Sequence, residues 1–185
     1  MSALLRFDKV ALRRGGRLLF DNLDLSLEPG EALQVSGPNG SGKSSLIRLA
    51  AGLLGAERGR VERTPVALAD DHLALDRERT LRKALWMWVP YYPLDRALEI
   101  MGIEELADVR VQLLSTGQAQ KARLARVIAS DVCLWLFDEP QNGLDADGVE
   151  RLGFAIDSHL RLGGAVLAAS HQPLPGEWRE LELGK

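Results

Sequence analysis

Gly37-Pro38-Asn39-Gly40-Ser41-Gly42-Lys43-Ser44-Ser45 is the stretch that decides the fold of this chain. It follows an apolar run, Ala32 to Val35, and precedes Leu46 to Ala51, which has the composition of a helix. A strand, a loop of the form G-x-x-x-x-G-K-[ST] and a helix, in that order, are typical of the phosphate-binding P-loop. The sequence therefore predicts a binding site for a nucleoside triphosphate.

The residue types of this loop fit the chemistry of a phosphate chain. Its three glycines lack a Cβ atom, so the backbone can turn consecutive N–H groups toward one anion, and the helix N-terminus adds partial positive charge. Lys43 is expected to reach the β- and γ-phosphates of ATP, and the Ser44 hydroxyl to ligate Mg²⁺. A chance glycine-rich turn is the alternative, but the strand and helix around the motif argue against it. The predicted nucleotide-binding residues are Gly37, Pro38, Asn39, Gly40, Ser41, Gly42, Lys43, Ser44 and Ser45.

Composition places the chain among ordinary globular proteins. Its 185 residues, 46% hydrophobic and 26% charged, can form one core with room for a small subdomain. The net charge of −3 comes from intermixed acidic and basic residues, which leaves no basic track for nucleic acid. No apolar run approaches a membrane span, so a membrane part would belong to another chain. The single cysteine, Cys133, is expected to be buried, and the lack of a disulfide partner suits a reducing cytosol.

The first half of the chain predicts an α/β core that is interrupted by a helical insert. Two antiparallel strands are expected before the P-loop, at Leu4 to Leu12 and Leu23 to Leu27, and a buried strand at Val66 to Ala69. Apolar residues then recur at helical spacing over Thr80 to Trp88 and over Leu94 to Met101. We therefore expect a single domain over residues 1–185, with a small helical subdomain over about residues 70–130 inserted in the core.

Aromatic residues gather in the predicted insert, at Trp86, Trp88, Tyr91 and Tyr92. They form either the core of the insert or an exposed groove for a partner helix, where such side chains commonly act as anchors. The sequence leaves both interpretations open.

The second half continues the core with alternating helices and strands. Helices are expected over Ala119 to Ala129 and Asp145 to Leu160, and strands over Val132 to Phe137 and Ala165 to Ala169. Polar residues follow both strands, and ligands bind at the carboxyl ends of the strands in parallel sheets.

The first of these two strands ends in Asp138-Glu139. An apolar strand followed by aspartate is the Walker B pattern, in which Asp138 holds Mg²⁺ beside Ser44. Glu139 is the expected general base or positioner of the attacking water, and a positioned base contributes roughly 10²–10⁴-fold to a rate. The pair is a strong signal because it follows a buried strand downstream of a P-loop.

The motif Leu114-Ser115-Thr116-Gly117-Gln118 has no evident task within its own P-loop site. The order of P-loop, helical insert, L-S-x-G-Q, Walker B with glutamate, and a histidine after the next strand resembles the nucleotide-binding domain of ATP-binding cassette (ABC) proteins over essentially the whole chain. The resemblance implies a P-loop NTPase fold of the ABC type: a mixed central sheet with an antiparallel N-terminal part and a small helical subdomain. It also implies a head-to-tail dimer that encloses two ATP molecules.

The same resemblance suggests a role for each remaining motif. Ser115, Gly117 and Gln118 would complete the γ-phosphate site of the opposite copy, a use that suits a helix N-terminus. His171 resembles the switch histidine that contacts the γ-phosphate, and Asp145 the loop that communicates between the two sites. The predicted catalytic residues are thus Lys43, Glu139 and His171, and the predicted Mg²⁺ ligands are Ser44 and Asp138.

A narrower resemblance rests on Asp145 to Leu152 and Ser170 to Leu174, which lie outside the general ABC motifs. These stretches are similar to those of the haem exporter ATPases, the ATP-binding subunits of cytochrome c maturation systems. That family implies a peripheral subunit on the cytoplasmic face of the bacterial inner membrane, docked on separate transmembrane subunits of a haem-handling complex. ATP hydrolysis would there drive haem export or transfer.

One departure from the ABC pattern follows the strand that ends at Ala69. The family has a glutamine there that links Mg²⁺ and the attacking water to the membrane subunit, whereas this chain has Asp70-Asp71-His72, with Asp71 the best match. A carboxylate adds negative charge beside the phosphates, so we expect weaker coupling of ATP hydrolysis to the membrane subunit or an altered metal dependence.

Two further expectations concern single residues. His72 and His159 are expected at the surface. Arg14 is expected either to stack on the nucleotide base or to lie in a solvated turn.

Other functions stay open at this point. Another small ABC transporter, or a soluble ABC-type ATPase outside transport, would share these motifs. Soluble members usually carry two cassettes, a long coiled-coil insert or basic surfaces, which this sequence lacks. A module that uses ATP for assembly but hydrolyses little is kept open by the missing glutamine, although Lys43, Asp138, Glu139 and His171 argue against it.

Overall fold

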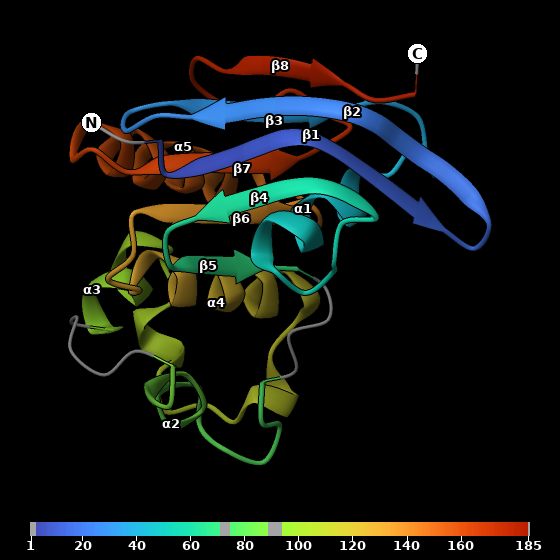
Figure 1. Ribbon diagram of the computed structural model, residues 1–185. Helices are drawn as coiled ribbons and strands as arrows, with labels where there is room; N and C mark the ends of the chain where they lie inside the picture. The colour runs from blue at the N-terminus through green and yellow to red at the C-terminus, as the bar shows by residue number, and fades with distance from the viewer. Residues whose placement is uncertain (1–2, 71–74, 89–93, 185) are drawn as a thin grey trace.

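The centre of the molecule is a five-stranded parallel sheet with the strand order β5-β6-β7-β3-β8 (Figure 1). The computed structural model describes residues 3–70, 75–88 and 94–184. The strands of this sheet are β3 (Ala32–Ser36), β5 (Val66–Ala69), β6 (Leu134–Asp138), β7 (Ala165–Ala169) and β8 (Arg179–Glu182). One strand, β7, therefore separates β3, which leads into the P-loop, from β6, which ends in the acidic pair.

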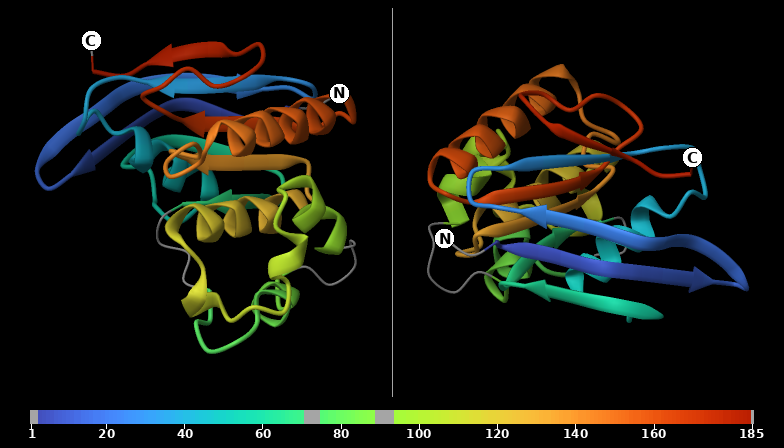
Figure 2. Two further views of the ribbon diagram at one scale, coloured as in Figure 1. Left: turned by 180° about the vertical axis from the view of Figure 1, so that it is seen from behind. Right: turned by 45° about the horizontal axis from the view of Figure 1, so that its top comes forward.

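A three-stranded antiparallel sheet, ordered β2-β1-β4, forms a separate layer (Figure 2). Its strands are β1 (Leu5–Arg14), β2 (Arg17–Leu27) and β4 (Arg58–Arg63). The two strands expected before the P-loop are confirmed, although β2 begins earlier than expected. Neither β4 nor β8 was expected, because both strands are mostly charged and exposed, so no apolar alternation marks them.

Helices account for most of the remaining chain. They are α1 (Lys43–Ala51), α2 (Leu81–Trp86), α3 (Leu94–Ile100), α4 (Thr116–Ile128) and α5 (Ala146–Arg161), with short 3₁₀ helices η1 (Glu104–Leu106) and η2 (Val111–Leu113). Those from α2 to α4 lie between β5 and β6 in the chain and gather at one end of the molecule (Figure 1). In the three described ranges, no helix has both the length and the apolar composition needed to cross a bilayer.

Two apolar cores lie on opposite faces of the parallel sheet, because successive side chains of a strand point to opposite sides. On β6, Leu134 and Leu136 face the core that contains α1 and the antiparallel sheet. Trp135 and Phe137 face the core that contains helices α2 to α5. Burial on both faces explains why β6 and β7 are continuous apolar runs rather than alternating ones.

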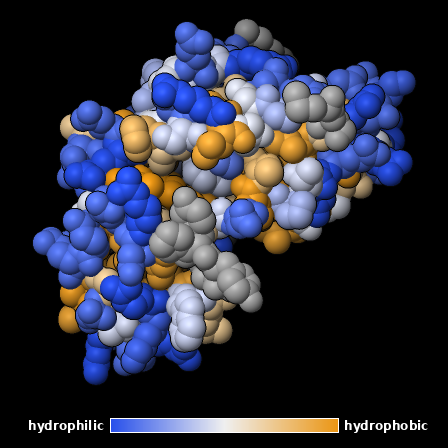
Figure 3. Space-filling model, turned by 90° about the vertical axis from the view of Figure 1, so that its left-hand side faces the viewer, coloured by the Kyte–Doolittle hydropathy of each residue, from blue (hydrophilic) through white to orange (hydrophobic). Residues whose placement is uncertain are grey.

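The exposure of individual side chains corrects two expectations and answers one open question for two of its four residues. Cys133 is exposed, which contradicts its expected burial, because it lies just before β6 begins. His159 is half-buried rather than a surface residue, since its ring stacks on Trp135 with the centroids 3.7 Å apart. Trp86 is 71% exposed and Trp88 52% exposed, so these two belong to a surface and not to a core. Elsewhere, apolar residues reach the face seen in Figure 3 in separated patches among charged ones.

Candidate nucleotide site

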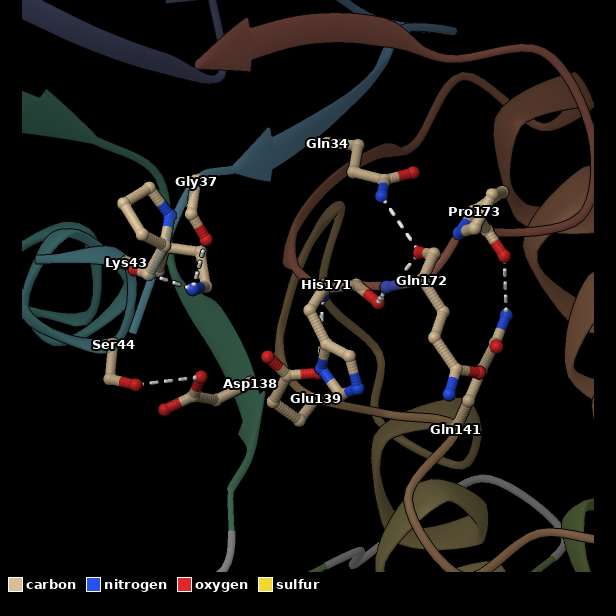
Figure 4. Close-up of polar contacts among 12 residues, drawn as sticks. Gln34, Gly37, Lys43, Ser44, Asp138, Glu139, Gln141, His171, Gln172 and Pro173 are labelled. Atoms are coloured by element: carbon tan, nitrogen blue, oxygen red, sulfur yellow. Dashed lines mark hydrogen bonds and ion pairs between the residues drawn. The ribbon is translucent and has the colours of Figure 1, made fainter. Parts of the chain in front are cut away.

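The predicted site residues meet at the carboxyl edge of three adjacent parallel strands. Val35 of β3 lies opposite Ala169 of β7, and Ala169 lies opposite Asp138 of β6. The P-loop, the acidic pair and His171 therefore leave the sheet at the same level, and Figure 4 shows their side chains around one space. This is the edge at which parallel sheets bind ligands.

The P-loop presents backbone N–H groups and a buried ammonium group. Gly42 caps α1 in a left-handed conformation, with no side chain bonded to the helix N-terminus. A Cβ atom on Gly37 would lie 2.4 Å from the carbonyl oxygen of Leu183, so only glycine fits there. Lys43 is 7% exposed, and its Nζ donates to the carbonyl oxygens of Gly37 at 2.7 Å and Pro38 at 3.2 Å. The loop thus concentrates positive charge where the sheet ends.

The donor set beside the loop fits a hard divalent cation. Ser44 Oγ donates to Asp138 Oδ1 at 3.0 Å, and Asp138 is 8% exposed (Figure 4). Within the described ranges, no group of three or more His, Cys, Asp or Glu side chains could hold a metal. A hydroxyl and one carboxylate suit Mg²⁺, which is usually bound by few protein oxygens together with substrate phosphates and water. The buried Ser41 Oγ, in the same loop, has no hydrogen-bond partner in the protein.

Glu139 is held in an unusual backbone conformation that aims its carboxylate at His171. Its φ is +52°, a left-handed value that is uncommon for a residue other than glycine and that recurs at active sites. The backbone N–H of Glu139 donates to the carbonyl oxygen of Ala169 at 2.8 Å, and its Oε2 lies 2.7 Å from His171 Nδ1. The carboxylate is 22% exposed and the imidazole 51%, so both can reach a ligand at the sheet edge.

The buried Gln34 and the half-buried Gln141, neither of which belongs to a predicted motif, fix the segment after His171. Gln34 Nε2 donates to the carbonyl oxygen of Gln172 at 2.9 Å, and Gln141 Nε2 donates to that of Pro173 at 3.1 Å (Figure 4). The Ser170 hydroxyl also donates to the Gln172 carbonyl, at 2.8 Å. The feature of the sequence that could have indicated this contact is the polar residue Gln34 inside an apolar strand.

The L-S-x-G-Q motif forms the N-terminus of α4, and two of its backbone N–H groups are bonded within the motif. Ser115 Oγ accepts from the backbone N–H of Gln118 at 3.2 Å, and Gln118 Oε1 accepts from that of Ser115 at 2.9 Å, which is a complete capping box. A Cβ atom on Gly117 would lie 2.7 Å from the carbonyl oxygen of Gly143. The motif is therefore packed directly against the loop that precedes α5.

Asp145 ends that loop and caps α5. Its Oδ1 accepts from the backbone N–H of Gly148 at 2.9 Å and lies 3.0 Å from Lys121 Nζ of α4. The hydrogen bond from Lys121 and that from Gly148 hold the pKa of the Asp145 carboxyl below its usual value. Asp145 is thus a fixed anion between the two helices.

Several predicted residues lie elsewhere. Arg14 is exposed at the end of β1, and its Nη1 donates to Ser45 Oγ at 3.4 Å, so its guanidinium lies beside the start of α1. Asp71, the match to the missing glutamine, lies outside the described residues, as do His72, Tyr91 and Tyr92.

Comparisons with known proteins agree with this geometry. The family described as ABC transporter matches residues 20–142. The cytochrome c biogenesis ATP-binding export protein CcmA of Sphingopyxis alaskensis is 52% identical over 177 residues, with 92% of this chain and 91% of that protein covered. The protein of the same name from Novosphingobium aromaticivorans is 50% identical, with 89% and 87% covered. A solved structure of the ATP binding subunit of an ABC transporter superposes with a TM-score of 0.83 at 20% identity, covering 91% of this chain and 79% of that one, and shows the same fold.

Proposed function

The chain belongs to the ABC transporter family, among the cytochrome c biogenesis ATP-binding export proteins, and from this premise we propose that it drives haem export or transfer for cytochrome c maturation. It acts as the ATP-hydrolysing subunit of a membrane complex, on the cytoplasmic face of the bacterial inner membrane. The observation that carries the catalytic part is the 2.7 Å contact of Glu139 with His171, directly beside the Ser44–Asp138 pair.

Each site residue has a task in this proposal. The P-loop N–H groups and Lys43 bind the phosphates, and Ser44 and Asp138 would hold Mg²⁺, which supplies charge neutralisation on the phosphate oxygens. Glu139 accepts the proton of the attacking water. His171, hydrogen-bonded to the Glu139 carboxylate, orients it, and the imidazole is close enough to the sheet edge to contact a γ-phosphate as well.

The proposed catalytic unit is a head-to-tail dimer of single-domain copies, each with the helical subdomain of about residues 70–130. In such a dimer, Ser115, Gly117, Gln118 and Asp145 face the ATP that is bound by the P-loop of the other copy. Helix N-termini stabilise anions, which supports this use of the start of α4.

The exposed side chains at the end of α2 support a docking surface for the membrane subunit. Trp86, Met87 and Trp88 are 71%, 72% and 52% exposed. Clusters of exposed aromatic residues commonly anchor protein interfaces. Within the chain, the guanidinium of Arg126 lies 5.2 Å from the centroid of the Trp88 ring, and Arg79 Nη1 donates to Met87 Sδ. Most of the surface of the three side chains nevertheless stays exposed, so we place the transmembrane partner here.

Purification of the tagged full-length chain from detergent-solubilised native membranes tests the proposal. We expect mass spectrometry to identify haem-handling membrane proteins, and an absorbance spectrum of the same sample to show haem. Trp86→Ser should abolish co-purification, whereas Phe154→Ser, which alters a 63% exposed side chain on α5, should not. An unrelated permease would leave an ABC ATPase without the haem role, and a sample with no membrane protein would favour the soluble class.

A further inference from the structure

Lys121 lies at the junction of the two segments that the proposed dimer presents to the opposite copy. It follows the L-S-x-G-Q motif on α4, yet its ammonium group reaches the start of α5. Nζ lies 3.0 Å from Asp145 Oδ1 and 3.5 Å from Asp147 Oδ2. The lysine side chain is only 12% exposed, whereas the two carboxylates are 67% and 56% exposed.

The surroundings of Lys121 are shaped to admit it. A Cβ atom on Gly148 would lie 2.8 Å from Lys121 Cε and 2.9 Å from Asp145 Oδ1. Glycine at this helical position therefore leaves the space through which the lysine crosses the first turn of α5. Glycine costs a helix interior about 1 kcal/mol relative to alanine, so its presence here needs a reason of this kind.

A second contact joins the same two segments. Gly117 of α4 approaches the carbonyl oxygen of Gly143 so closely that any larger residue would clash. Gln120 Nε2, also on α4, donates to the carbonyl oxygen of Pro140 at 3.0 Å. The start of α4 is thus connected to the whole loop from residue 140 to residue 145, and Lys121 supplies the only charged link of these three.

We propose that Lys121 is a positioning residue, which locks Asp145 to the L-S-x-G-Q helix so that both enter the opposite copy's ATP site as one preformed unit. The inference rests on the proposed dimer and deepens it. A preformed unit loses less conformational freedom when the dimer closes, which raises the affinity of the two copies. Without the ammonium group, Asp147 would keep Arg151 as its partner, but Asp145 would lose its ion pair at the point where the dimer must close.

Dimerisation in the presence of ATP separates this role from a structural one. In the Glu139→Gln background, where hydrolysis is slowed, Lys121→Met should raise the dimer dissociation constant about tenfold in analytical ultracentrifugation, because Asp145 would no longer be held to α4 and its ordering would oppose dimer closure. The affinity of the dilute monomer for a fluorescent ATP analogue should stay unchanged, and Lys121→Arg should restore most of the dimer.

Two further variants test whether the position of the Lys121 ammonium group matters. Gly148→Ala displaces the lysine without removing its charge and should weaken the dimer in the same direction. Arg151→Met is the matched control, because Arg151 Nε pairs with Asp147 at 2.7 Å, whereas the ion pair with Asp145 is made by Lys121, and this variant should leave dimerisation intact.

These measurements separate the role of Lys121 from the existence of the dimer. An unchanged dimer constant for Lys121→Met would overturn the role of Lys121, as would an equal loss of monomer ATP affinity, which would mark a general structural defect. Failure of Glu139→Gln itself to dimerise with ATP would overturn the proposed dimer, and the role of Lys121 with it.

Discussion

The N-termini of α1 and α4 are both suited to bind an anion, but only the N-terminus of α4 is capped by side chains. At α1, the capping residue is Gly42 and no side chain bonds to the helix N-terminus. At α4, Ser115 and Gln118 satisfy each other's backbone groups in a capping box. The first end has no side-chain cap, which suits the proposed binding of a phosphate by its own copy. The second satisfies the N–H groups of Ser115 and Gln118 within one chain, which suits the proposed surface that meets its ligand only in a dimer.

The largest expected effect separates phosphate binding at α1 from cleavage. Glu139→Gln should lower ATP turnover by roughly 10²–10⁴-fold, because a positioned base contributes that much, and should leave ATP affinity intact. Steady-state ATPase assays and nucleotide titration measure the two quantities. Glu150→Gln, an exposed glutamate on α5, is the control. Wild-type turnover in Glu139→Gln would mean that the base lies elsewhere.

Removal of the Lys43 charge at the N-terminus of α1 should weaken ATP binding itself. Lys43→Met should weaken ATP affinity by roughly 10²-fold, because a buried charged donor to phosphate is lost and loss of such a contact costs about 2–5 kcal/mol. Isothermal titration of ATP measures this, with the exposed Lys83→Met of α2 as the matched control. Equal affinities of the two variants would show that Lys43 does not contact the phosphates.

A change at the α4 end should spare ATP binding and affect only the dimer. Gly117→Ala places a Cβ atom 2.7 Å from the Gly143 carbonyl oxygen, so the motif or the loop must move. Overpacking of this kind costs about 1–3 kcal/mol, and we expect about a tenfold loss of ATPase activity at fixed protein concentration. Gly55→Ala is the control, because a Cβ atom there meets nothing within 4 Å. If Gly117→Ala instead lowers ATP affinity, the proposed division between the two ends is wrong.

The smallest expected effect tests the capping box. Gln118→Ala removes the acceptor of the Ser115 N–H and should lower the melting temperature by about 2–4 °C, since a cap contributes about 1 kcal/mol. Differential scanning calorimetry measures this against Gln112→Ala, which alters an exposed glutamine of η2. A variant that melts with the wild type would indicate that the two side chains serve the partner and not the helix.

The motifs could be predicted from the sequence because they depend on local chemistry. Gly37 to Ser45 requires a strand before it and a helix after it, and both are present. The continuous apolar runs of β6 and β7 predicted buried strands, and both strands are buried in the sheet. The same reasoning failed for β4 and β8, whose charged residues are held in place by backbone hydrogen bonds to neighbouring strands rather than by apolar burial.

The sequence alone determined that this chain carries a P-loop, a Walker B acid pair and an L-S-x-G-Q helix, since each is a short run of residues with a fixed spacing. Only the tertiary structure decided what brings them together. The strand order sets Asp138 level with Val35, the left-handed backbone turns Glu139 toward His171, and Lys121 meets Asp145 across two helices. These contacts join residues far apart in the chain, so their existence depends on sheet register and helix packing, which no local pattern specifies.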